Sequence, residues 1–595
     1  MRPRHVADNS SLRENLLQTV RRHPERPALT YRVNRGSSRP AGNWHTITWH
    51  EFGLLVVEVA NEIEELCEPG CTVAVLAGND ARYPILEQAV IATGRKLQPL
   101  YTSTPNDELM RAMSVTGANV VVVGDDQEAR ALECPLADEM MRAAVRVIGL
   151  SALVRLPCTP DRAGGLLRAD TEPFDTDQVR AHLSRWPERL ETDAVLYLQS
   201  TGTTGPAHVI EISEKAILAA MQALPDELLN AHPTVLSFLP TGHISERLLV
   251  GYLSVGLAAH TWFGGGIETL GADLSHCKPS VFLVPPLVLE AIRSEATAAA
   301  SASRLGRWLL KSAAADAARN ATQTLTGPMN RGLQSRLFGW RLRRKCGLNR
   351  ADVAISGTAP LSADVHAWWE TLGLPLRNVY GQTEVSGATS MTRPVGSVRG
   401  GVGCPLSWVE VKVADNGELL VRSPSMFTRY VGDERRTVDA FESGWFKTGD
   451  RARLTGNGEL VLLGRIQSII PTPGGGVADL NDLTRRVTSA LGAADVAYFR
   501  DRAGVHVYVA VHPDGVPRHS LMDQGILDPI PISDPLTDIL QSQLRSFPGR
   551  DAIAGFGLFR GAFGFRDGEV GPTGKARGWR IHQLHGAQHV RLDKV

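Results

Sequence analysis

The chain has 595 residues, with 63 basic and 63 acidic side chains, so its formal net charge is zero. A neutral chain has no global field that would draw it to nucleic acid or to an anionic membrane, and we expect no nucleic-acid partner. Hydrophobic residues make up 43% and charged residues 21% of the sequence, as in ordinary globular proteins. The length predicts two or three domains.

The N-terminus and the cysteines bear on where the protein works. The N-terminal sequence MRPRHVADNS has no apolar run after its arginines, and no apolar stretch is long enough to cross a membrane, so we expect neither a signal peptide nor a transmembrane segment. The seven cysteines are scattered, and no second close pair joins Cys67 and Cys71 to complete a zinc site. We interpret them as reduced thiols and expect a cytoplasmic protein.

Strand-like and helical runs alternate through the first four hundred residues. Short apolar, β-branched runs occur at 72–78, 119–126, 194–200, 234–240, 280–286 and 352–357. Runs that are apolar on both faces are typical of buried parallel strands. Helical patterns lie between them, as at 213–224 and 362–373. The alternation predicts an α/β fold, with a large N-terminal domain of parallel sheets flanked by helices.

The pattern changes after about residue 405. Residues 408–423 read as a hairpin that turns at Asn416-Gly417, and 505–512 read as a further strand. The Pro- and Asp-rich segment 513–536 is typical of a surface loop. With a hinge near 464–470, we expect a small, mobile α+β C-terminal domain over 466–595, following a large domain over 1–465.

A basic segment at 331–350 carries five large apolar residues, Leu333, Leu337, Phe338, Trp340 and Leu342. One interpretation is a surface helix that touches a membrane or a lipid substrate. The favoured interpretation is an amphipathic helix with a solvated basic face.

The sequence QSTGTTGPAH at 199–208 follows one predicted strand and precedes a predicted helix. Glycines allow the backbone N–H groups to converge, and Ser and Thr hydroxyls add donors, so the loop can form an anion-binding nest. Taken alone, it is equally well explained as an ordinary turn. It is not a P-loop, because no lysine follows Gly205.

Further motifs follow in order: LPTGHISERLL at 239–249, ISGTAPLS at 355–362, YGQTE at 380–384, GELLVRSPSMFTRY at 417–430, a GD and GR pair within 444–465, and GPTGKARGW at 571–579. This series resembles the adenylate-forming superfamily of acyl-CoA synthetases, peptide-synthetase adenylation domains and luciferases, and is nearest the long-chain fatty acyl-CoA synthetase branch. The resemblance implies an AMP-forming ligase that uses ATP and Mg²⁺ to activate an acid as its AMP anhydride and releases pyrophosphate.

The resemblance also implies residue roles. Lys575 would bridge the attacking carboxylate and the α-phosphate, Glu384 would hold Mg²⁺, and His243 would lie near the acyl carboxylate. The adenine, ribose and phosphates would contact Ser200, Thr201, Gly202, Thr203, Thr204, Gly205, Gly357, Thr358, Ala359, Tyr380, Gly381, Gln382, Thr383, Asp450 and Arg465. Singly, each of these residues could instead serve a turn or a helix cap. We expect the acid pocket to come from about 239–266 and 355–390.

Two departures from the family pattern affect the acceptor. The phosphate loop has His208 where the family has lysine, and the hinge has Gln467 followed by Pro471 and Pro473. Adenylation keeps its main residues, whereas the acceptor stays open among CoA, a carrier protein and an aryl amine. One alternative is therefore an ATP-dependent diazotase of a natural-product pathway, which would activate nitrite for transfer to an aromatic amine. A second alternative is an inactive nucleotide-binding protein.

Overall fold

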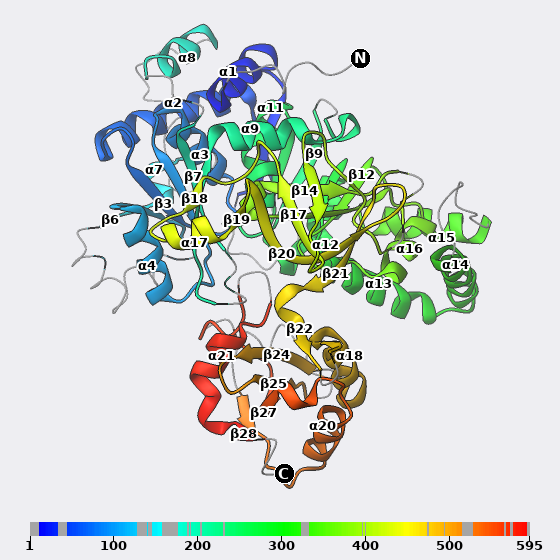
Figure 1. Ribbon diagram of the computed structural model, residues 1–595. Helices are drawn as coiled ribbons and strands as arrows, with labels where there is room; N and C mark the ends of the chain where they lie inside the picture. Colours follow the sequence, from blue (N-terminus) through cyan, green and yellow to red (C-terminus); the bar gives the residue numbers. More distant parts are fainter. Residues whose placement is uncertain are drawn as a thin grey trace.

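The computed structural model of the chain (Figure 1) describes residues 11–33, 44–125, 127, 140, 145–157, 176–186, 190, 192–200, 202, 205–229, 232–322, 333–394, 397–398, 400–472, 475–492, 494–513, 527–564, 567–571 and 575–591.

A seven-stranded sheet forms the first layer of the large part of the molecule. Its strands lie in the order β18 (Arg429–Tyr430), β8 (Val209–Ser213), β7 (Ala194–Gln199), β4 (Lys96–Leu100), β3 (Thr72–Leu76), β5 (Val120–Val123) and β6 (Arg146–Gly149). The strands from β7 to β6 are parallel, and β8 and β18 add an antiparallel edge. Alternate residues of β3 face different cores: Val73 and Val75 share a cluster with helices α2 (Trp49–Leu66) and α3 (Arg82–Ala92). Ala74 and Leu76 pack with α4 (Asn106–Thr116) on the other face.

A nine-stranded sheet forms the second layer. Its order is β15 (Cys404–Pro405), β14 (Gly387–Met391), β13 (Leu376–Gln382), β12 (Val353–Ser356), β11 (Val281–Leu283), β9 (Thr234–Ser237), β10 (His260–Phe263), β1 (Pro27–Arg32) and β2 (Trp44–Thr48). Val235, Val281 and Val353 point into the core shared with the first sheet. The neighbouring residues Leu236 and Phe282 pack on the opposite face with α14 (Arg304–Thr322), α15 (Leu333–Lys345) and α16 (Ala363–Thr371). Helices therefore flank sheets that are largely parallel, as predicted.

The other helices of the large part are α1 (Leu12–Arg22), α7 (Leu150–Leu153), α8 (Thr176–Leu183), α9 (Glu214–Ala223), α10 (Ile244–Glu246), α11 (Ser254–Gly256), α12 (Leu270–Cys277), α13 (Pro286–Ser301) and α17 (Glu434–Asp439). The third sheet contains β16 (Glu410–Val413), β17 (Glu418–Arg422), β20 (Trp445–Leu454), β19 (Phe441–Glu442) and β21 (Leu460–Arg465). The predicted hairpin is its β16–β17 pair, and Gly417 adopts the positive φ of +82° that the turn requires.

The smaller C-terminal part lies below the rest of the molecule in Figure 1 and follows the β21–β22 connection. It contains the β22 (Ile469–Pro471) and β23 (Val477–Asp479) pair, and a five-stranded sheet of β24 (Ala494–Arg500), β25 (Val505–Val511), β27 (Ile553–Gly561), β26 (Leu527–Pro529) and β28 (Val590–Arg591). Helices α18 (Leu480–Leu491), α20 (Pro535–Arg545) and α21 (Gly578–His585) accompany the sheet. The predicted fold class is thus confirmed, and the domain boundary at residue 465 stays a prediction.

One expectation about the secondary structure needs correction, and another is confirmed. The predicted loop 513–536 contains strand β26, and α20 begins at Pro535, because Leu527 and Pro529 pair with the edge of β27; residues 514–526 lie outside the described part. The predicted helix at 331–350 is present as α15. It buries Phe338 and Leu342 but leaves Leu333, Leu337 and Trp340 exposed. In the described part of the chain, no helix is long and apolar enough to cross a membrane.

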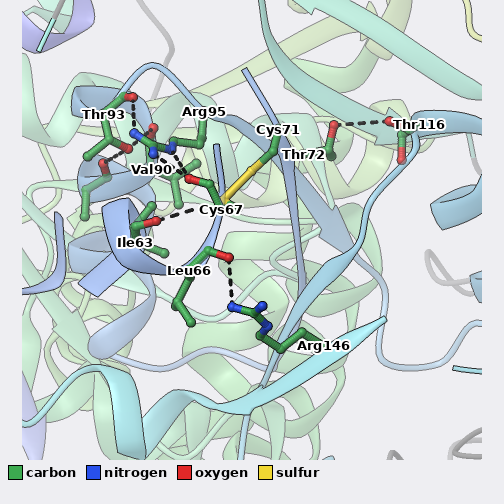
Figure 2. The surroundings of a disulfide bond; sticks show 11 residues. Ile63, Leu66, Cys67, Cys71, Thr72, Val90, Thr93, Arg95, Thr116 and Arg146 are labelled. Atoms are coloured by element: carbon green, nitrogen blue, oxygen red, sulfur yellow. Dashed lines mark hydrogen bonds between the residues drawn. A yellow bond between two sulfur atoms is a disulfide. The ribbon is translucent and has the colours of Figure 1, made fainter. Parts of the chain in front are cut away.

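The expectation of reduced thiols is wrong for Cys67 and Cys71, which are joined by a disulfide directly after α2 (Figure 2). The bond closes a short loop between α2 and β3, where the chain reverses and brings the two Cα atoms to 6.4 Å. Arg95 donates to the Cys67 carbonyl and Arg146 to the Leu66 carbonyl, so two cations satisfy the C-terminal end of the helix. Cys277, Cys346 and Cys404 are free thiols.

Candidate active site

A cavity of about 860 Å³ opens where the nine-stranded sheet, the third sheet and the C-terminal part meet. We call the part lined by Ser200, Thr383, Glu384, Arg465 and Lys575 the polar mouth, and the part lined mainly by leucine and valine side chains the apolar arm. Of the predicted site residues, the cavity is lined by Ser200, Gly202, Gly205, His243, Gly357, Thr358, Gly381, Gln382, Thr383, Glu384, Arg465 and Lys575. Segments that are hundreds of residues apart in the sequence therefore converge on one pocket.

Asp450 is the centre of a hydrogen-bond network behind the polar mouth. It lies on β20, and its carboxylate accepts hydrogen bonds from the Tyr380 hydroxyl and the Gln382 amide, each at 2.7 Å. Arg465 on β21 pairs with it at 3.1 Å, since the two residues are direct partners in the ladder. Burial and the neighbouring carboxylate raise the pKa of Tyr380 well above its ordinary value, which keeps its hydroxyl a donor. Asp450 and Tyr380 thus support the cavity wall from behind.

Backbone geometry at two predicted positions is specific. Gly381 lies so close to strand β14 that a Cβ atom would sit 1.6 Å from the Gly387 carbonyl oxygen, so only glycine fits there. Thr358 follows β12 with a φ of 72°, which is costly for a β-branched residue. Strained positions of this kind cluster at binding sites, and Thr358 lines the cavity.

Glu384 lies in the η4 turn (Thr383–Val385) directly after β13. Its Oε1 accepts a hydrogen bond from the Tyr430 hydroxyl at 3.0 Å, and burial raises the pKa of the carboxyl group. A carboxylate that lines a polar cavity is a ligand of the kind that Mg²⁺ prefers together with phosphate oxygens. Glu384 therefore fits the metal-ligand role that the sequence predicts.

The predicted phosphate loop connects the antiparallel strands β7 and β8. Ser200 and His208 close it through two hydrogen bonds, from the Ser200 N–H to the His208 carbonyl and from the His208 N–H to the Ser200 hydroxyl. Thr201, Thr203 and Thr204 lie outside the described residues. The described glycines Gly202 and Gly205 both border the cavity.

Arg436 places a positive charge beside the loop where the lysine is missing. It lies on the short helix α17, lines the cavity, and stacks over the Tyr430 ring at 5.2 Å. Burial lowers the pKa of His208, and the nearby Arg436 lowers it further, so the histidine is mainly neutral at neutral pH. Sequence reasoning missed Arg436, because nothing in the spacing shows that α17 returns to the loop.

Lys575 reaches the same mouth from the C-terminal part. It remains accessible to solvent in the cavity, while the surrounding protein and the charge of Arg465 lower its pKa. Two contacts hold its segment against the large part: the Trp579 indole donates to the Gly202 carbonyl at 2.8 Å, and Arg577 pairs with Glu108 at 3.0 Å in a buried position.

His243 stands between the polar mouth and the apolar arm. It caps α10, and its Nδ1 accepts the Ser245 N–H at 3.2 Å. Burial and the charge of Lys575 lower the pKa of His243 to about 4, so the ring is neutral at neutral pH. The chain then continues into a π-helix, η2 (Arg247–Leu253), a geometry that is frequent at functional sites.

The apolar arm extends beyond His243 over the inner face of the nine-stranded sheet. It is lined by Leu224, Leu228, Val235, Leu248, Leu249, Leu253, Leu257, Val281, Leu283, Ile355, Val379, Ala388 and Met391. The predicted pocket segments 239–266 and 355–390 contribute, but the arm also uses Leu224 directly after α9, together with η1 (Asp226–Leu228), β9 and β11. Ala359, Tyr380 and Asp450 are absent from the lining of this cavity, although Tyr380 and Asp450 support it.

The fold and the pocket define the class of ATP-dependent adenylate-forming ligases. The chain belongs to the AMP-binding enzyme family, which it matches over residues 16–431. It is 27% identical over 448 residues to the long-chain-fatty-acid–CoA ligase FadD15 of Mycobacterium bovis, covering 73% of this chain and 72% of that protein. It is 25% identical to the human long-chain-fatty-acid–CoA ligase 1, covering 67% and 59%.

Solved structures share the fold. ATP-bound MatB from Rhodopseudomonas palustris is 18% identical and superimposes with a TM-score of 0.64 over 97% of this chain and 99% of that chain. O-succinylbenzoate coenzyme A synthetase from Bacillus subtilis, in complex with ATP and magnesium ion, is 17% identical, with a TM-score of 0.62 over 95% and 98%. The predicted family and enzyme class are confirmed, and the comparisons support neither the diazotase nor the inactive protein.

Proposed function

We propose that this enzyme activates long-chain fatty acids and transfers the acyl group to CoA. The observation that carries the proposal is the apolar arm, which opens into the polar mouth beside His243 and Lys575. An alkyl chain in the arm gains about 0.8 kcal/mol for each buried CH₂, and its carboxylate reaches the mouth. The relatives named as long-chain-fatty-acid–CoA ligases support the same choice.

In the proposed first step, a carboxylate oxygen attacks the α-phosphorus of ATP, the bond to the bridging oxygen breaks, and pyrophosphate leaves. Lys575 and Thr383 stabilise the charge that develops on the α-phosphate oxygens, and Arg465, which Asp450 holds from behind the cavity wall, orients the ribose. Glu384 would hold Mg²⁺, which neutralises charge on the phosphate oxygens.

In the second step, the CoA thiol loses its proton to solvent and attacks the acyl carbon, and AMP leaves with the electron pair of the broken bond. Gln467 lines the cavity, so the hinge remains part of the site despite its departure from the family pattern. A carrier-protein thiol would react in the same way. Because ATP and CoA are cytoplasmic metabolites, we place the reaction in the cytoplasm.

The test is pyrophosphate release with ATP and Mg²⁺, across saturated fatty acids of graded length, aromatic acids and nitrite, with and without CoA or an aryl amine. We expect release with long fatty acids and acceleration by CoA. The Leu249→Trp variant narrows the arm and should shift the preference to shorter acids, whereas Leu249→Met conserves volume and should not. Release with nitrite and amine alone would overturn the proposal.

Lys575→Ala should reduce pyrophosphate release by about 10²–10³-fold, the usual effect of removing one preorganised charge donor. The matched control is Lys215→Ala, an exposed lysine on α9, which should release pyrophosphate at the normal rate. Near-normal release by Lys575→Ala would remove Lys575 from the mechanism.

A further inference from the structure

Three histidines and one aspartate gather on the C-terminal sheet. Asp501 follows β24, His506 lies in β25, His582 lies in α21, and His589 follows that helix. Asp501, His506 and His582 each offer one donor atom, and these three atoms lie within 4.8 Å of one another. The adenylation chemistry proposed above uses none of them.

The central ring points one nitrogen into this cluster. His506 is only 7% exposed, and its Nε2 is buried. That nitrogen lies 3.0 Å from Asp501 Oδ1. An imidazole nitrogen and a carboxylate oxygen at this separation can both bind one metal ion placed between them.

The second nitrogen of each inner ring is already occupied. His506 Nδ1 lies 3.1 Å from His589 Nε2, and His582 Nδ1 lies 2.5 Å from the Tyr508 hydroxyl. The Phe499 ring also stacks on His582, with a centroid distance of 4.4 Å. Metal-binding histidines characteristically hydrogen-bond through the nitrogen that does not hold the metal, because this bond sets the tautomer and the ring orientation.

We propose that Asp501, His506 and His582 form a binding site for a divalent transition metal, with Zn²⁺ as the best fit. Two imidazole nitrogens and one carboxylate oxygen suit Zn²⁺, with water in the fourth position. Mg²⁺ and Ca²⁺ prefer oxygen ligands throughout and are disfavoured. Asp501 is the exposed member of the set, so the metal can enter from solvent.

The site would fasten α21 to the sheet. Two ligands come from the β24–β25 hairpin region and the third comes from α21, which also carries Trp579 and directly follows the segment with Lys575 and Arg577. A metal here would therefore hold the helix that places Trp579 against the phosphate loop. The proposed role is structural, and it does not depend on the identity of the acid or the acceptor.

The experiment uses untagged full-length protein, stripped with a chelator and titrated with Zn²⁺ or Co²⁺ without ATP. We expect one equivalent to bind, Co²⁺ to show the visible absorption of a low-symmetry nitrogen and oxygen site, and Zn²⁺ to raise Tm. His582→Ala and the milder Asp501→Asn should each weaken Zn²⁺ binding at least ~100-fold. Tyr508→Phe, which removes a positioning hydrogen bond, should weaken it ~10-fold.

His512→Ala is the matched control, because His512 directly follows β25 and lies 3.1 Å from Asp495, outside the cluster. This variant should bind Zn²⁺ normally. The proposal is overturned if the parent protein binds no Zn²⁺, or if folded Asp501→Asn and His582→Ala bind it as tightly as the parent. Either result would mean that the cluster is only an Asp–His ion pair with stacked rings.

Discussion

The positive charge beside the predicted phosphate loop comes from Arg436 on α17 and not from a lysine in the loop. The loop carries the mainly neutral His208 where the family has lysine, and Arg436 on α17 lines the cavity next to it. Asp433 is also near His208, with its Oδ2 atom 3.8 Å from His208 Nδ1. We infer that Arg436 provides the fixed cation for the outgoing pyrophosphate, and that the loop contributes its backbone.

This inference predicts unequal effects for two substitutions. Arg436→Gln should raise the KM for ATP by ~10-fold or more, because a charge-assisted hydrogen bond contributes about 1.5–3 kcal/mol. His208→Ala should have a smaller effect, ~2–10-fold, since a neutral hydrogen bond contributes about 0.5–1.5 kcal/mol. The double variant His208→Lys/Arg436→Gln should restore ATP binding, because the lysine returns a positive charge to the site.

The pH profile gives an independent check. The pKa of His208 is lowered, so its ring gains a proton only at a pH below the ordinary histidine pKa. The protonated ring adds a positive charge, so ATP binding should strengthen as the pH falls. His208→Ala should lose this strengthening. Equal KM values for Arg436→Gln and the parent enzyme would assign the charge to another residue.

At the scale of elements, one buried ion pair joins α4 to the segment that carries Lys575. Arg577 and Glu108 are 1% and 3% exposed in their side chains and 3.0 Å apart. Removing one partner of such a pair costs about 3–5 kcal/mol, because the other charge stays buried without its partner. The pair therefore opposes any undocking of the Lys575 segment from the large part.

Arg577→Met should slow single-turnover pyrophosphate release ~10²-fold or more, with Lys575 still present. The Glu108→Gln/Arg577→Met double variant should recover part of the loss, since no buried charge remains. Arg580→Met is the control, because Arg580 makes exposed local contacts within the same helix and to Asp567. If Arg577→Met releases pyrophosphate at the same rate as the control, other contacts, such as Trp579 with Gly202, hold the Lys575 segment against the large part.

At the scale of the whole molecule, we propose that the chain has two domains, 1–465 and 466–595. The cavity includes Arg465, Gln467 and Lys575, so its mouth spans the proposed boundary. A ligand that fills the mouth must therefore bind the docked arrangement and stabilise it. Bound at 100 times its Kd, such a ligand adds about 2.7 kcal/mol.

Calorimetry should show two unfolding transitions for the free protein. A non-hydrolysable acyl-adenylate analogue should bring the two transition temperatures closer together and raise both. In Arg577→Met the transitions should lie further apart, because docking is weaker. A single transition in every sample, with and without the analogue, would mean that the two parts unfold as one unit.

The strands of the large part were predictable because their physics is local. Segments such as 73–76 and 120–123 are apolar at every position, and short valine-rich runs of that kind favour strands buried on both faces. Gly417 was predicted from the Asn416-Gly417 turn, and Gly381 from the YGQTE motif of the family that the sequence resembles. Strand β26 was missed because Pro529 and its neighbours read as a loop, and only the free edge of β27 makes them a strand.

By itself, then, the sequence determined the class of fold and the order of the motifs, since each depends on local pattern. Its resemblance to a known family pointed to Asp450, Glu384 and Lys575 as site residues, and their roles stay predictions. Only the tertiary structure decided that α17 brings Arg436 to the loop, that η2 and the sheet enclose an apolar arm, and that three histidines meet beside Asp501. These features join residues that are distant in the chain. No local pattern specifies them, because chain packing alone determines which side chains share a cavity.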